Sequence, residues 1–192
     1  MDSPRFRDLG SRSRRRTPAS RKYPPNDWTL DETESRLAAE PVEWAYVFAL
    51  DGRQLLRRRG TRRTVFFSPD EYALLANAQV IHNHPVEERE QPEALTFSRM
   101  DLVFAIRFDV AELRVVSGGW RFVLRRPEGG WPVDDEIAGV VYDEFRAEVD
   151  AELTQAVVHG QISAAEREQR MAHEVIERLA AWGGFEYRRE RR

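Results

Sequence analysis

A segment of alternating bulky and small side chains, residues 42–50, constrains the fold of this chain most strongly. The bulky residues share one parity: Val42, Trp44, Tyr46, Phe48 and Leu50. The other parity carries Glu43 among the smaller residues Ala45, Val47 and Ala49. A period of two is typical of a β-strand whose bulky face packs on a core. Asp51-Gly52 is a hairpin signal that predicts a return strand over 54–58. The chain must therefore build a sheet, and the small face leaves room for a group to approach Glu43.

The other periodic segments alternate between strand and helix. Further strands are expected at 64–67, 79–83, 113–117 and 120–124, and Phe185 with Tyr187 forms either an edge strand or a packed tail. Helices are expected at 30–40, 68–77, after Ser98, at 137–157 and at 163–183. The spacing of a capping box occurs at three of their starts, in Thr29/Glu32, Ser68/Glu71 and Ser163/Glu166. The apolar stripe of the fourth helix is Ile137, Val141, Phe145, Val149, Leu153 and Val157, with Val140 beside it. This order predicts an α/β fold, a mixed β-sheet flanked by helices with a C-terminal two-helix extension.

Composition removes several classes of protein and site. The 192 residues include no cysteine, which excludes a disulfide scaffold, a thiolate nucleophile and cysteine-ligated metals, and which fits a cytoplasmic protein. Any metal must be bound by histidine and carboxylate. No apolar run is long enough to span a bilayer, and no apolar segment follows the basic N-terminus as in a secretory signal, so no membrane association is expected.

The N-terminal segment is strongly basic although the whole chain has a net charge of −3. Its cations are Arg5, Arg7, Arg12, Arg14, Arg15, Arg16, Arg21 and Lys22. Residues 1–22 could neutralise nucleic-acid phosphates, or they could be a solvated arm; both interpretations stay open. We expect three parts: a disordered basic tail over 1–26, a metal-binding domain over 27–132 and a helical extension over 133–192.

Two of the four histidines lie together in the run His82-Asn83-His84-Pro85. At a strand end, residues i and i+2 point to the same face, so both imidazoles can reach one metal ion. Downstream, Ser98 and Asp101 place a hydroxyl and a carboxylate at a helix start. Two histidines and a carboxylate suffice for catalytic zinc with water in the fourth position. Glu43 could then accept and return the water proton.

Each of these residues also has a purely structural interpretation. The histidines could be structural residues at a strand end, Ser98-x-x-Asp101 is a capping box in its own right, and Glu43 could be only a polar residue at a strand start. His159 and His173 are interpreted as structural or surface residues. Trp120, Phe122, Trp131 and Trp182 are assigned to packing, and the terminal arginines 188, 189, 191 and 192 to a solvated end.

The ordered set Glu43, His82-x-His84-Pro85 and Ser98-x-x-Asp101 resembles the JAMM (JAB/MPN) metalloprotease superfamily. The His-Asn-His-Pro run and the strand VEWAYVFALDGRQLL are most similar to the RadC-like branch, of which a similar form accompanies phage proteins. The resemblance covers residues 42–125. It implies a JAB/MPN-like, cytidine-deaminase-like layout with a Zn²⁺ cofactor, in which His82, His84 and Asp101 are the metal ligands.

The same resemblance implies that Glu43 is the general acid/base and that Ser98 holds the oxyanion or the water. The implied reaction is hydrolysis of a peptide or isopeptide bond, often next to a ubiquitin-like protein. Thirteen residues separate His84 from Ser98, more than is usual in the family, and the acidic loop 86–97 could be a lid, a specificity element or a plug. The alternatives are a non-catalytic binding module for a protein partner and a DNA-associated RadC-like protein that uses the basic tail.

Overall fold

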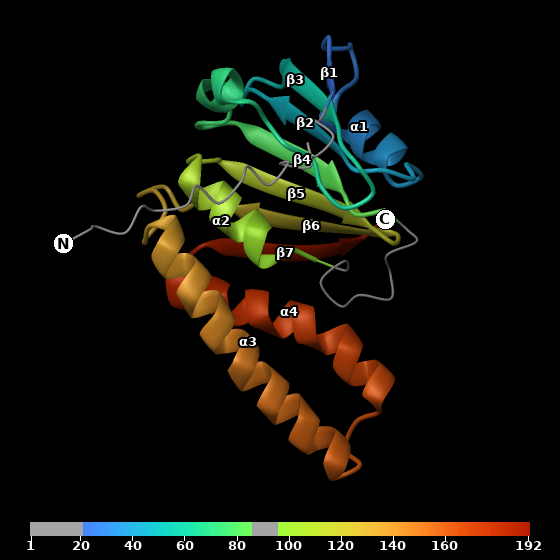
Figure 1. Cartoon of the computed structure of the whole chain (residues 1–192), viewed down its shortest axis with the longest axis vertical. Coiled ribbons are helices and arrows are strands. Elements are labelled where there is room, and N and C mark those ends of the chain that lie inside the picture. The colour runs from blue at the N-terminus through green and yellow to red at the C-terminus, as the bar shows by residue number, and fades with distance from the viewer. Residues whose placement is uncertain (1–20, 86–95) are drawn as a thin grey trace, which may run out of the picture.

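A single seven-stranded mixed sheet organises the protein. The computed structural model in Figure 1 describes residues 21–85 and 96–192. The strands are β1 (Arg21–Tyr23), β2 (Trp44–Phe48), β3 (Gln54–Arg59), β4 (Gln79–Asn83), β5 (Glu112–Ser117), β6 (Trp120–Arg125) and β7 (Glu186–Arg191), in the spatial order β1-β3-β2-β4-β5-β6-β7. The central β4–β5 pair is parallel, and the other neighbours are antiparallel. The predicted α/β class with a mixed, helix-flanked sheet is confirmed.

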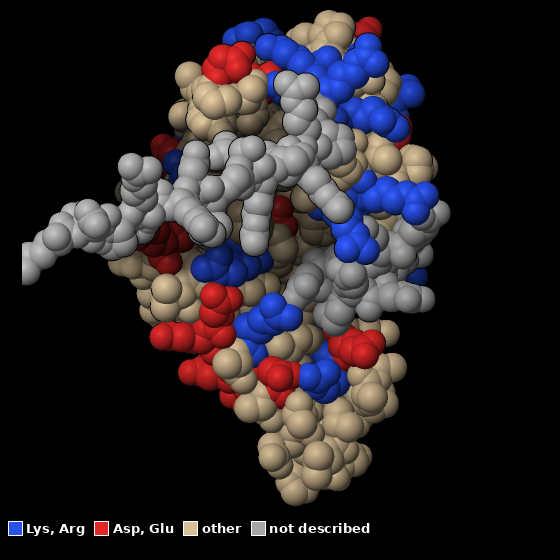
Figure 2. Space-filling model, in the orientation of Figure 1, with Lys and Arg blue, Asp and Glu red and all other residues tan. Residues whose placement is uncertain are grey.

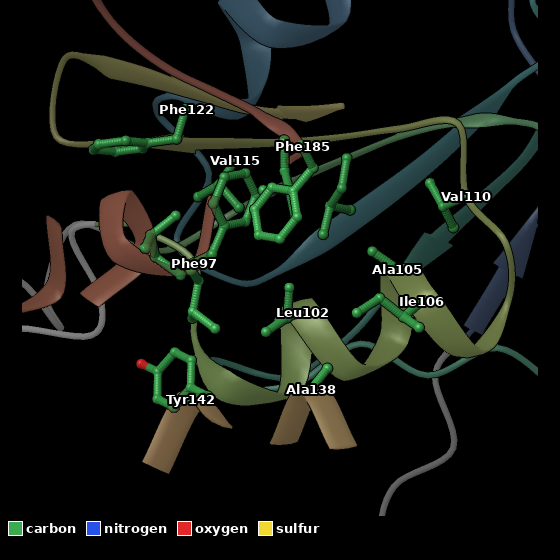
Figure 3. Packing of buried hydrophobic residues seen from close by; sticks show 14 of the residues in the cluster. Phe97, Leu102, Ala105, Ile106, Val110, Val115, Phe122, Ala138, Tyr142 and Phe185 are labelled. Atoms are coloured by element: carbon green, nitrogen blue, oxygen red, sulfur yellow. The ribbon is translucent and has the colours of Figure 1, made fainter. Parts of the chain in front are cut away.

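Helices cover both faces of this sheet (Figure 1). They are α1 (Leu30–Leu37), the 3-10 helix η1 (Pro69–Leu74), α2 (Arg99–Arg107), α3 (Asp135–Val158) and α4 (Ala164–Gly183). On one face, α1 packs Leu37 against Tyr46, Phe48, Ile81 and Val116. On the other face, α2, α3 and α4 enclose the larger core, part of which Figure 3 shows. The alternation expected for β2 therefore holds, but both of its faces are buried.

The C-terminal third belongs to the same core as the sheet. Val149 of α3 and Ile176 of α4 are fully buried in one cluster with Val115 of β5 and Leu102 of α2. The chain then returns as β7, which pairs with β6 along its length. The edge-strand alternative for Tyr187 is thus confirmed. Because they complete both the core and the sheet, the last sixty residues are joined to the preceding part by burial and by backbone pairing.

Three expectations for the first half are corrected. No strand forms at 64–67, because β3 already pairs with β1 on one side and β2 on the other and offers no free edge. The helix expected over 68–77 is the shorter η1, in which Leu75 N–H bonds the Tyr72 carbonyl three residues back. Residues 21–26, expected to be disordered, are not, because Arg21–Tyr23 adds β1 to the edge of β3. Residues 1–20 lie outside the described residues.

Two expectations for the C-terminal part are also corrected. The apolar stripe of α3 is confirmed between Val141 and Leu153, where Val149 and Leu153 are buried and Val141 and Phe145 pack against the core, but at its start Ile137 and Val140 are exposed, while Tyr142, which was not in the stripe, is buried. The cause is that the first turns of α3 meet α2, where Arg99 bonds the Gly139 carbonyl, and the later turns meet α4. The terminal arginines are a solvated end only in part, because Arg188 is half-buried whereas Arg189, Arg191 and Arg192 are exposed. They lie in or beside β7, and the Arg189 guanidinium stacks 3.9 Å from the centre of the Trp120 ring.

Candidate metal centre

The two histidines lie where the central strand β4 ends. His82 faces Ala45 of β2 on one side and Val115 of β5 on the other, in a fully paired part of the sheet. His84 follows β4, and its backbone N–H bonds the Val116 carbonyl at 3.0 Å. Both imidazoles therefore leave the same face of a rigid support, as the i, i+2 spacing predicts.

Asp101 reaches the histidines from the first turn of α2. Its Oδ1 lies 3.1 Å from His82 Nε2, its Oδ2 lies 3.7 Å from His84 Nε2, and the two Nε2 atoms are 3.2 Å apart. Within the described residues, these three are the group of side chains close enough to bind one metal ion. The sequence thus identified correctly which distant residues meet, and the cluster could hold a metal ion.

The charge of Asp101 is favoured by its surroundings. Burial opposes ionisation, but the charge and hydrogen bond of His82, the charge of His84 and the Ser98 backbone N–H outweigh it and lower the pKa of Asp101. Burial likewise opposes protonation of His82, yet attraction by Asp101 and by Glu43 raises its pKa. The carboxylates of Asp101 and Glu43 therefore favour positive charge at His82.

Ser98 holds the Asp101 carboxylate in place. The Ser98 backbone N–H and hydroxyl donate to Asp101 Oδ2 at 2.7 and 2.8 Å, and the Ser98 Oγ accepts the Asp101 N–H at 3.2 Å. This is a complete capping box, so the structural interpretation of Ser98-x-x-Asp101 is confirmed. The same bonds act on a candidate ligand, because they turn one carboxylate oxygen to the helix and leave the other toward His82.

Glu43 lies in the wall of the cavity that contains these residues. The cavity has a volume of about 460 Å³, and Glu43, His82, His84, Ser98 and Asp101 all line it. The Glu43 side chain is buried, and its charge acts on His82. The structure therefore brings together all five residues that the sequence singled out.

The backbone of Glu43 is fixed from two sides. Its N–H bonds the Thr61 carbonyl and its C=O accepts the Gly60 N–H, both at 2.7 Å. From β4, the Asn83 side chain accepts the Trp44 N–H at 2.8 Å and donates to the Val42 carbonyl at 3.0 Å. The Asn83 amide thus takes the place of the next ladder residue and fixes the residues on either side of Glu43.

Sequence reasoning missed the apolar walls of the cavity and the residues that position Glu43. The walls include Val65, Phe66 and Phe67 of the loop after β3, and Met100 and Phe104 of α2. Gly60 allows the loop to fold back, since a Cβ there would lie 2.1 Å from the Thr64 carbonyl oxygen. An asparagine between two candidate ligands was the one available signal for Asn83, and no periodicity marks the loop.

The other two histidines are structural, as predicted. His159 caps the C-terminus of α3. His173 of α4 is buried, and its Nδ1 lies 2.8 Å from the Tyr187 hydroxyl. Burial, together with the charge of Arg189, lowers the pKa of His173 to about 4 and keeps it neutral. The candidate lid at 86–97 cannot be assessed as a whole, because residues 86–95 lie outside the described residues.

Comparisons with known proteins add no name to this site. No family model matches the chain, and no curated protein or solved structure matches it either. Among the described residues, no helix is long and apolar enough to cross a membrane. The function is therefore inferred from the residues and geometry of the site.

Proposed function

We propose that this chain is a zinc-dependent hydrolase of the JAMM type that cleaves a peptide or isopeptide bond. The observation that carries the proposal is the meeting of His82, His84 and Asp101 in one cavity with Glu43 in its wall. The histidine pair lies at the end of the central strand β4, Asp101 lies on the first turn of the next helix, and Glu43 directly precedes the adjacent strand β2. This arrangement supports a JAB/MPN-like layout of the RadC-like type.

The spacing of the three side chains fits zinc. Ligands bound tetrahedrally at about 2.0–2.1 Å lie about 3.3 Å from one another. The closest observed separations are 3.2 Å between the two imidazole nitrogens and 3.1 Å between His82 and Asp101. Only the 3.7 Å between His84 Nε2 and Asp101 Oδ2 exceeds that value, and a small rotation of His84 would close it. Two imidazoles and one carboxylate are also the donor set of known catalytic zinc sites, which keep a fourth position open.

The chain's own side chains supply the proton transfers. When bound, zinc would polarise the scissile carbonyl and lower the pKa of a water molecule. Glu43 takes a proton from that water on its carboxylate and then gives it to the leaving amine, so the carboxylate is regenerated. Val65, Phe67 and Phe104 give the cavity an apolar wall beside these groups.

Ser98 has a defined part in this proposal. Its hydroxyl proton is engaged by Asp101 Oδ2, so its observed contribution is to orient a candidate metal ligand. Oxyanion stabilisation by Ser98, which the family resemblance implies, requires the hydroxyl to exchange Asp101 for the substrate oxygen. Ser98→Ala therefore affects metal affinity as well as turnover if Ser98 orients Asp101, and turnover alone if it acts only on the oxyanion.

Metal content tests the first half of the proposal. Purified wild-type chain should contain about one zinc per molecule after reconstitution, measured by mass spectrometry. His82→Ala/His84→Ala should contain almost none. His159→Ala, which removes an exposed imidazole at a helix end, is the matched control and should retain the metal. A wild-type protein that takes up no zinc would exclude the zinc hydrolase, and the domain would then be a binding module.

Turnover tests the second half. The zinc-loaded chain is incubated with peptide libraries and with ubiquitin-like fusions, and the products are identified by mass spectrometry. Glu43→Gln should keep the metal and lose hydrolysis by a factor of about 10²–10⁴, the usual contribution of a general acid/base. Full metal occupancy in a wild type that cleaves neither class of substrate would favour the non-catalytic alternative.

A further inference from the structure

A cluster of arginines at the β1 edge of the sheet is not explained by the proposed hydrolase. The register places Arg21 of β1 directly opposite Arg59 of β3, and Tyr23 opposite Arg57. Since side chains two residues apart share a face, all four lie on the same face of the two strands. We call Arg21, Arg57 and Arg59, with Tyr23 among them, the basic edge. Figure 2 views the molecule from the α2 side, where further Lys and Arg side chains gather near β1 and β3, so the face that carries the basic edge is turned away from the viewer.

The described residues offer the basic edge no neutralising partner. In the part of the chain that the structure describes, no carboxylate forms an ion pair with Arg21, Arg57 or Arg59. Like charges directly opposite one another on neighbouring strands are destabilising. The sheet therefore tolerates a repulsive pair, Arg21 and Arg59, at an exposed edge.

Elsewhere on the same face, arginines are paired. Arg114 of β5 bonds Glu34 at 2.7 Å, Arg125 of β6 bonds Glu112 at 2.6 Å, and Arg121 bonds both Glu34 and Glu190. Among the described residues, carboxylates thus pair with the arginines of β5 and β6 on this face, whereas none pairs with Arg21, Arg57 or Arg59; on the opposite face of β3, Arg58 pairs with Glu71. This contrast identifies the basic edge as a surface arranged for an external anion.

Aromatic rings lie between the cations. The guanidinium groups of Arg21 and Arg57 lie 5.2 and 5.5 Å from the centre of the Tyr23 ring, which packs 5.1 Å from Trp44. Arg57 is also held by the Pro24 carbonyl at 2.6 Å, so its position is fixed without a counter-ion. Planar cations among ring faces are the groups that contact phosphates and stack on bases.

We propose that the basic edge binds the sugar-phosphate backbone of a nucleic acid without sequence preference. The arginines would contact neighbouring phosphates. This surface includes folded residues, unlike the basic tail alone, and it does not depend on the hydrolase.

The test measures binding of fluorescein-labelled single-stranded and duplex oligonucleotides to the full chain by anisotropy at several salt concentrations. Arg21→Gln/Arg59→Gln should weaken binding about 10- to 50-fold near 0.1 M salt and reduce the salt slope by about 2, since each phosphate contact contributes about 0.9 on duplex DNA. Arg21→Lys/Arg59→Lys should retain most of the binding, which also shows that the edge tolerates substitution.

The matched control is Arg170→Gln/Arg178→Gln on α4, where both arginines are paired with glutamates. It changes the net charge by the same amount and should bind like the wild type. Equal losses in the two glutamine variants would mean a net-charge effect and would overturn the proposal, as would unchanged binding in Arg21→Gln/Arg59→Gln. Binding of polyglutamate but not of oligonucleotides, lost in the same variant, would assign the edge to an acidic protein instead.

Discussion

Replacing Asn83 tests the way in which the fold fixes Glu43. Asn83 is 1% exposed, and its amide bonds the Trp44 N–H at 2.8 Å and the Val42 carbonyl at 3.0 Å. Asn83→Ala leaves both backbone groups without these partners. An unsatisfied buried polar group costs about 1–3 kcal/mol, and both residues are half-buried, so the free energy of unfolding should fall by about 2–4 kcal/mol. That is a large part of a typical stability of about 5–15 kcal/mol.

Urea unfolding measures this loss, and amide hydrogen exchange locates it. The Trp44 amide should exchange faster in Asn83→Ala, because its acceptor is gone. Asn83→Asp separates the two bonds: the acceptor for Trp44 remains, while a carboxylate faces the Val42 carbonyl. Zinc affinity should change little in either variant, since Asn83 bonds no ligand side chain, while any hydrolysis that depends on Glu43 should fall.

Asn26→Ala is the control for the loss of an asparagine. The Asn26 side-chain oxygen also bonds across the chain, accepting the Gln54 amide at 2.9 Å, but neither residue lines the cavity; the backbone N–H of Asn26, which donates to Gln54 Oε1 at 2.8 Å, is kept in the variant. Asn26→Ala should cost about 1 kcal/mol and leave Trp44 exchange unchanged. A loss below about 0.5 kcal/mol in Asn83→Ala, together with unaltered exchange at Trp44, would refute the argument that this amide fixes the strand.

Three further results are expected. Gly60→Ala should destabilise the chain by about 2 kcal/mol or more, because the new Cβ would lie 2.1 Å from the Thr64 carbonyl oxygen and 2.8 Å from Val65 Cα, both of them backbone atoms. The control Gly129→Ala, whose Cβ would have nothing within 4 Å, should be neutral. Equal melting temperatures of the two variants would contradict this. The pKa of His173 is about 4 in the folded chain against the ordinary 6.5 of a histidine, so the unfolded chain binds more protons between these values. Stability should therefore fall by about 2–3 kcal/mol from pH 6.5 to pH 4, and His173→Phe should lose this part of the dependence in urea titrations; an unchanged pH profile would count against a neutral His173. Asp101→Asn keeps a side chain that can cap α2 but removes the charge beside His82. Zinc affinity measured by calorimetry should therefore fall at least tenfold, with little change in far-UV circular dichroism. An affinity equal to that of the wild type would exclude Asp101 as a ligand.

Local signals in the sequence determined the elements that carry the candidate metal centre. The strand over 79–83, the cap at Ser98 and the spacing of His82 and His84 depend on backbone geometry and on contacts within a few residues. Their meeting followed from the order of the elements, and all five candidate residues line one cavity. The chemistry assigned to them stays a prediction that metal content and turnover test.

Tertiary structure decided what local patterns do not encode. Whether 64–67 pairs as a strand depends on a free sheet edge, and β1 and β2 occupy both edges of β3. Which residues of α3 are buried depends on the helices it meets, so Ile137 is exposed and Tyr142 is not. The support of Glu43 by Asn83 joins residues forty positions apart. Whether Arg59 meets a carboxylate depends on where the fold places the acidic residues, and none of those described forms an ion pair with it. Sequence alone thus determined the local elements and the candidate ligands. Strand partners, buried faces and charge neutralisation are properties of the folded chain, because they depend on residues that only folding brings into contact.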